Sequence, residues 1–189
     1  MATYINAATS TNRVKLWIQL YSLATSTTAG DGDGTAAIAQ ADFMTIGVGG
    51  AITEEGGAFY VPSLQDITLN NSNGSFRWKQ LDQDGESVIT TNATNSLSGN
   101  FVLDPSTFFG TTGAAGTTAE ELGIFNLANK RHQVAFMLSI EGDAVGKRAL
   151  VGNGFISGLA PTVSADSPVW VSPITIEVNG DLTQITLDD

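Results

Sequence analysis

Short runs in which apolar and polar residues alternate recur along most of the chain. In the first of them the apolar side chains fall at every second position: Val14, Leu16, Ile18 and Leu20. A period of two places these side chains on one face of a β-strand. Further runs with strand character occupy 43–48, 58–61, 67–69, 75–81, 87–91, 97–103, 133–141, 149–159, 169–178 and 182–187. Turn residues separate them at intervals of about 8–12 positions, which is typical of a β-sandwich or barrel.

Two turn signals lie in the middle of this pattern. The dipeptide Asn73-Gly74 is typical of two-residue hairpin turns, so we expect the chain to reverse there. The stretch 82–85, Asp-Gln-Asp-Gly, predicts the next turn. Between them Phe76 and Trp78 share one strand face, while Arg77 and Lys79 share the other.

One short helix is predicted at about 118–130. Thr118 and Glu121 have the spacing of a capping box, in which each side chain binds the other's backbone N–H group. Leu122 and Phe125 follow at helical spacing, and the pair Lys130-Arg131 lies where a helix C-terminus favours cations. The helix has about three turns, so it covers at most one face of a core.

Two segments rich in Gly, Thr and Ala predict long loops or arms, at about 24–41 and 104–117. Small side chains bury little area, so such a segment is ordered chiefly by what lies next to it. We therefore expect a mainly β protein: an antiparallel β-sandwich or barrel of about nine or ten short strands, flanked by one short α-helix, in a single domain over 1–189.

Composition narrows the possible functions. The chain has no Cys and one His, which excludes disulfides, Cys-ligated zinc, iron–sulfur clusters, thiol nucleophiles and sites with two imidazoles. Its 8 Lys and Arg against 19 Asp and Glu give a net charge of −11, which opposes tight binding to DNA phosphates or anionic membranes. We expect no signal peptide and no membrane anchor, because no basic n-region or long apolar run is present.

Candidate chemistry is sparse. The acidic stretches 31–34 and 82–86 resemble calcium loops only in part, and Asp-Gly is equally a turn dipeptide. No Ser or Asp motif accompanies His132, and Glu54-Glu55 would point to opposite faces of a strand. We expect no catalytic residue, no metal site and no cofactor.

The basic residues are more informative, because all eight come in close pairs: Arg13/Lys15, Arg77/Lys79, Lys130/Arg131 and Lys147/Arg148. The first two pairs have i, i+2 spacing, which puts both cations on one strand face. One interpretation is a solvated face. The other is a basic patch that meets an acidic patch on an identical neighbour, the kind of heterologous contact that closes rings.

The last third of the chain resembles the major tail tube proteins of tailed bacteriophages. The resemblance covers about residues 118–185 and lies in the order of its segments: the strand at 133–141, Gly152-Asn-Gly-Phe-Ile156, the small-residue turn at 158–168, and a closing strand that ends in Asn179-Gly-Asp-Leu-Thr183. The resemblance implies a β-sandwich with one helix, hexameric rings that stack into a tube, and a loop that bridges rings. It also implies an acidic lumen through which genomic DNA passes without specific binding.

On this interpretation the protein is a structural virion protein of the tail, not an enzyme, and is made in the host cytoplasm. Its partners would be itself, a tail terminator, a tape measure protein and baseplate or distal tail proteins. The residues expected at contacts between subunits or rings are Asp31, Asp33, Thr35, Ile38, Arg13, Lys15, Arg77, Lys79, Lys147 and Arg148.

Two alternatives stay open. One is another virion structural protein, a capsid decoration or fibre protein. The other is a carbohydrate-binding β-sandwich in which Trp17, Trp78 or Trp170 stacks on a sugar ring and an Asp loop holds calcium.

Overall fold

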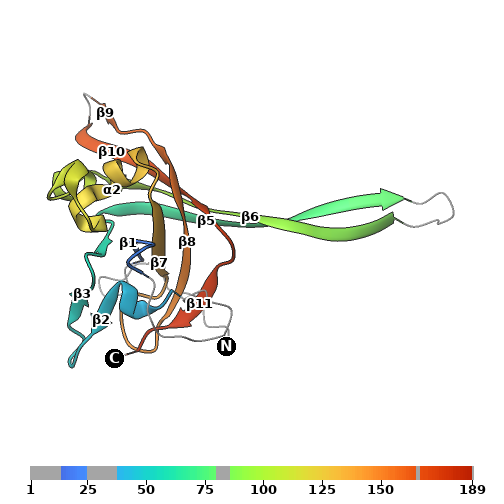
Figure 1. Ribbon diagram of the computed structural model, residues 1–189, viewed down its shortest axis with the longest axis horizontal. Helices are drawn as coiled ribbons and strands as arrows, with labels where there is room; N and C mark the ends of the chain where they lie inside the picture. Colours follow the sequence, from blue (N-terminus) through green and yellow to red (C-terminus); the bar gives the residue numbers. More distant parts are fainter. Residues whose placement is uncertain (1–13, 25–37, 80–85, 165–166, 189) are drawn as a thin grey trace.

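The protein consists of a β-rich body and one long two-stranded projection (Figure 1). The computed structural model describes residues 14–24, 38–79, 86–164 and 167–188. In the described residues the strands are β1 (Lys15–Leu20), β2 (Met44–Ile46), β3 (Ile52–Glu54), β4 (Phe59–Tyr60), β5 (Leu64–Lys79), β6 (Glu86–Val102), β7 (Gln133–Ser139), β8 (Arg148–Leu159), β9 (Thr162–Ser164), β10 (Ser167–Val178) and β11 (Thr183–Thr186). The helices are α1 (Pro105–Phe109) and α2 (Ala119–Asn129), with short 3-10 turns η1 (Gln40–Asp42) and η2 (Gly113–Ala115).

One large antiparallel sheet dominates the described structure. Its strand order is β4-β1-β7-β8-β10-β6-β5, with β11 paired to β8 and β9 paired to β10. The segment between β4 and β5 links the two ends of this order, since Val61 N–H donates to Leu16 O and Ser63 O accepts from Val102 N–H. The sheet therefore curls back toward itself, and the expected mainly β, sandwich- or barrel-like fold is confirmed.

Both faces of the sheet are buried where β1 and β7 run side by side. Leu16 and Ile18 face one apolar cluster, which α2 covers with Leu122 and Leu127. Trp17 faces a second cluster, together with segments that precede β3 and with the C-terminal Leu187. The first predicted strand is thus buried on both sides, because Trp17 and Gln19, on the face opposite Leu16 and Ile18, are each 1 % exposed.

The predicted helix is confirmed with its cap. Thr118 accepts from the Glu121 N–H group while the Glu121 carboxylate accepts from Thr118 N–H, at 3.3 Å in each case. Gly123 interrupts the helix with φ of +70°. A Cβ there would lie 2.2 Å from Gly110 N, so the two glycines allow α1 and α2 to approach backbone to backbone.

The two segments expected as long loops have different outcomes. The segment 104–117 folds into α1 and η2 against α2, because Asp104 caps α1, Pro105 begins it and Phe108 is buried. Most of the segment 24–41 lies outside the described residues. At its ends Ala24 is buried and Ile38 packs on the second cluster.

The hairpin expected at Asn73-Gly74 is wrong. Strands β5 and β6 continue through this point with 16 and 17 residues, and the dipeptide lies at a shift in their register, a β-bulge. Consequently 67–69 and the described part of 75–81 belong to one strand, β5, while 87–91 and 97–102 belong to its partner, β6. The pairing of β5 with β6 on both sides of the bulge outweighs the preference of this dipeptide for a turn.

Candidate functional site

The most prominent candidate surface is the projecting part of the β5–β6 hairpin, residues 71–79 and 86–95, which we call the arm (Figure 1). Strand β10 pairs with β6 only from Ser96 to Val102. Beyond Ser96 the arm has no third strand within the described structure. A two-stranded ribbon of this kind is at best marginally stable in water by itself, so contact with another surface would stabilise it.

The arm has two chemically different faces. Phe76 pairs with Ile89 and Trp78 with Ser87, which places these two aromatic rings and Ile89 on one face, because directly paired residues project to the same side. The rings of Phe76 and Trp78 stack with centroids 6.0 Å apart. We call Phe76, Trp78 and Ile89 the apolar face. On the opposite face Arg77 pairs with Val88.

A second candidate surface is a groove on the body beside α1. Its lining is apolar, and its volume is about 490 Å³. Phe108 and Phe109 of α1 meet edge to face at 4.9 Å, and Phe125 of α2 lies 5.8 Å from Phe108 and 6.0 Å from Phe109. The aromatic groove is lined by Leu103, Pro105, Phe108, Phe109, Phe125, Pro161 and Trp170. Three of its rings, Phe109, Phe125 and Trp170, are 42–56 % exposed, so much aromatic area faces solvent.

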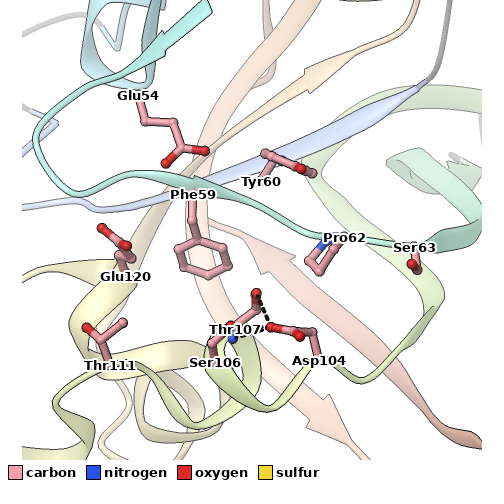
Figure 2. Close-up of a pocket in the computed structure, with 10 residues that line it drawn as sticks. All are labelled: Glu54, Phe59, Tyr60, Pro62, Ser63, Asp104, Ser106, Thr107, Thr111 and Glu120. Carbon is pink, nitrogen blue, oxygen red and sulfur yellow. Dashed lines mark hydrogen bonds between the residues drawn. The ribbon is translucent and has the colours of Figure 1, made fainter.

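An acidic pocket lies on the other side of α1 (Figure 2). It has a volume of about 370 Å³ and holds the carboxylates of Glu54, Asp104 and Glu120. Partial burial, together with the negative charge of Glu120, raises the pKa of Glu54 above its ordinary value, and Lys15 opposes this. Hydrogen bonds from Ser106 and from the Thr107 N–H group lower the pKa of Asp104. These bonds are the ones by which the Asp104 carboxylate caps the N-terminus of α1.

The basic residues named from the sequence divide between two places. Lys15 begins β1 and contacts residues of its own subunit. Its Nζ is 2.7 Å from the buried Asp143 carboxylate and 5.1 Å from the Tyr60 ring centroid. Arg148 begins β8 and forms an exposed ion pair with Glu141 at 2.6 Å, next to Lys147 in the β7–β8 loop.

The other pair, Arg77 and Lys79, lies near the end of β5, in the arm that projects from the body (Figure 1). The structure therefore brings Lys15, Lys147 and Arg148 to one end of the sheet, because β1, β7 and β8 are neighbours. It does not bring them together with the arm. Ile38 packs in the second apolar cluster. Arg13, Asp31, Asp33 and Thr35 lie outside the described residues.

The residues considered for other functions have clear positions. Trp17 is 1 % exposed, so it is no platform for a sugar, whereas Trp170 lies in the aromatic groove. Within the described ranges, no three His, Asp or Glu side chains cluster in a way that could hold a metal ion. The calcium-loop stretches fall largely on residues 31–34 and 82–85, outside those ranges. No helix among the described residues is long and apolar enough to cross a membrane.

Sequence reasoning missed both the length of the arm and the aromatic groove. The signal for the apolar face was visible, since Phe76 and Trp78 alternate with Arg77 and Lys79. The groove has a weaker signal, the Phe108-Phe109 pair in a segment otherwise rich in small residues. Its other walls come from α2, β10 and the turn at Pro161, which only the tertiary fold brings together.

This architecture, a curled antiparallel sheet with a capped helix and a projecting hairpin, is similar in fold to solved tail structures. The chain is similar to the tail of an empty gene transfer agent particle refined with C6 symmetry: the TM-score is 0.52 at 11 % identity, over 70 % of this chain and 89 % of that one. It is also similar to the SPP1 tail tube, with a TM-score of 0.51 at 12 % identity, over 77 % and 76 % of the two chains. No protein-family model and no curated protein matches the sequence. The resemblance to tail tube proteins expected from residues 118–185 is confirmed at the level of the fold.

Proposed function

We propose that this chain is a structural virion protein that polymerises as stacked hexameric rings into a tail tube, the conduit for DNA delivery. The observation that carries the proposal is the shared fold: two solved tail tube structures match at least 70 % of the chain. One of them has C6 symmetry, which supports six subunits per ring. The role is mechanical, and no catalytic step is part of it.

The arm supports self-assembly. It carries exposed apolar side chains and two strand edges that no other described strand pairs. Natural proteins avoid such edges unless a partner covers them, because they template pairing with other chains. In a closed ring every copy presents its arm to the same surface of its neighbour, so every arm in the ring is covered.

The charge of the chain supports a conduit. With a net charge of −11, like-charge repulsion removes the counterion-release attraction that would hold DNA in place. Genomic DNA would pass without specific binding. A tail terminator, a tape measure protein and baseplate or distal tail proteins are the further partners that a tube of this kind requires. The residues Asp31, Asp33, Thr35, Ile38, Arg13, Lys15, Arg77, Lys79, Lys147 and Arg148 stay predictions for contacts between subunits or rings.

Electron microscopy of the concentrated full-length protein tests this function. We expect rings with six-fold symmetry and hollow tubes built from them. Trimers, or binding only to preformed capsids, would instead favour a decoration or fibre protein. A chain that stays monomeric at every salt concentration, including after addition of tail initiator proteins, would rule out the tube.

A further inference from the structure

The arm and the aromatic groove are two exposed apolar surfaces of one chain, and they do not cover each other. Figure 1 shows the arm extending away from the end of the body that carries α2 and β9. Residues 86–95 alone extend it by about 33 Å at about 3.3 Å per residue. A subunit's own groove is therefore out of reach of its own arm.

We infer that the apolar face of one subunit's arm docks in the aromatic groove of a second copy of this chain, an assignment that rests on the proposed self-assembly. Apolar surface is stabilised by burial in proportion to its area, and both surfaces are rich in aromatic rings, which bury the most. Phe76 and Ile89 are 56 % and 51 % exposed on the arm, and Phe109 and Trp170 are 56 % and 51 % exposed in the groove.

The shapes of the two surfaces are compatible. The stacked rings of Phe76 and Trp78 form a ridge along one strand, with Ile89 beside it. The groove's volume of about 490 Å³ lies within the roughly 300–1,000 Å³ of pockets that bury whole ligands, so it has room for more than one side chain. Its lining is mainly apolar, so a docked apolar side chain covers few polar groups of the groove.

The contact is heterologous, because the arm and the groove are different surfaces, and it propagates from copy to copy.

Cross-linking between two singly substituted chains tests the contact directly, since the natural chain contains no Cys. The Ile89→Cys and Phe125→Cys variants are mixed, allowed to assemble and oxidised, and the linked peptides are identified by mass spectrometry. A disulfide requires Cα atoms within about 7 Å, so a link forms only where the arm of one copy meets the groove of another.

Two matched pairs serve as controls. Val88→Cys replaces Ile89→Cys, because Val88 is adjacent, equally exposed at 51 % and on the opposite face of the arm. Phe155→Cys replaces Phe125→Cys, because Phe155 is 41 % exposed against 42 % but lies on β8 outside the groove. We expect the Ile89/Phe125 link to exceed either control by about tenfold.

A second readout is the concentration at which assembly begins. Ile89→Ser should raise it by about tenfold, the factor expected when one large apolar side chain loses its burial, whereas Val88→Ser should change it much less. Circular dichroism confirms that each variant is folded, which these exposed positions favour.

The outcomes separate the two proposals. Rings or tubes that form without the Ile89/Phe125 link overturn the docking and leave the tube intact. Assembly that requires Phe125 but yields no link to the arm also overturns it, since another segment or protein then occupies the groove. A chain that forms neither links nor assemblies refutes the proposed function, and the docking with it.

Discussion

At the scale of single residues, backbone contacts and one buried ion pair hold the candidate surfaces in place. Gly110 and Gly123 meet backbone to backbone between α1 and α2, and both have positive φ. This contact holds α1 and α2 together and so keeps Phe109 and Phe125, with ring centroids 6.0 Å apart, as neighbours in the lining of the aromatic groove. Gly110 and Gly123, which have no side chains, thus determine the arrangement of the aromatic side chains in the groove.

Gly123→Ala is expected to destabilise the protein by about 2–4 kcal/mol. The Cβ would lie 2.2 Å from Gly110 N, and a left-handed φ adds its own penalty of about 1–2 kcal/mol. Urea unfolding measures the loss. Gly113→Ala is the matched control, because Gly113 has φ of +67° but open space around its Cβ, so only the conformational penalty remains. Equal losses in the two variants would contradict the close approach.

Asp143→Ala should cost about 2–4 kcal/mol of folding free energy. Its side chain is 1 % exposed and pairs with Lys15 at 2.7 Å, so its removal leaves a half-buried cation without its counterion. Thermal and urea unfolding test this. Glu141→Ala, which breaks the exposed pair with Arg148, should change stability little, because solvent screens that pair. A larger loss for Glu141→Ala than for Asp143→Ala would contradict the assignment.

At the scale of elements, the sequence predicted those helices and turns whose formation depends on residues close together in the chain. The helix at 118–130 was predictable because its cap, Thr118 with Glu121, lies within four residues. The turn at Asn73-Gly74 was not, since the pairing of β5 with β6 on both sides of the bulge outweighs the dipeptide's preference. Trp17 was a candidate sugar platform by sequence because much of the cluster that buries it, including Phe43, Met137 and Leu187, lies far away along the chain.

Deletion of the arm should leave the body folded and abolish assembly. Residues 72–94 would be replaced by an Asn-Gly turn between Asn71 and Asn95, which face each other across the ladder. The apolar clusters that hold the body include none of the described side chains from 72–94, so the melting temperature should change little. Sedimentation velocity and electron microscopy report assembly, and rings that form without the arm would contradict its role.

At the scale of the whole molecule, charge opposes the association that the exposed apolar surfaces favour. Every copy carries a net charge of −11, so approaching copies repel one another. Lys15 and Arg148, two of the eight cations, are engaged with carboxylates of their own subunit. Burial of apolar area therefore has to provide most of the driving force.

Added salt is expected to promote assembly. The screening length falls from about 30 Å at 0.01 M to about 8 Å at 0.15 M, which weakens repulsion between copies and leaves apolar contacts largely unchanged. Sedimentation at a series of NaCl concentrations gives the assembled fraction. Assembly that weakens steadily as salt rises would mean that ion pairs between subunits dominate, in favour of a basic patch that meets an acidic one.

The order of the elements along the chain has a consequence for synthesis on the ribosome. Both strands of the arm lie within residues 64–102 and pair with each other, so this hairpin needs only the first 102 of the 189 residues. The body can fold only after later residues are made. Strand β1 pairs with β7, with Lys15 opposite Ser139, and Gln40 forms hydrogen bonds with the backbone of Asp188. The groove also needs residues up to Trp170. During translation the residues of the arm are therefore made before those of the groove, so on the proposed docking a new chain could join a finished subunit before another chain could join it.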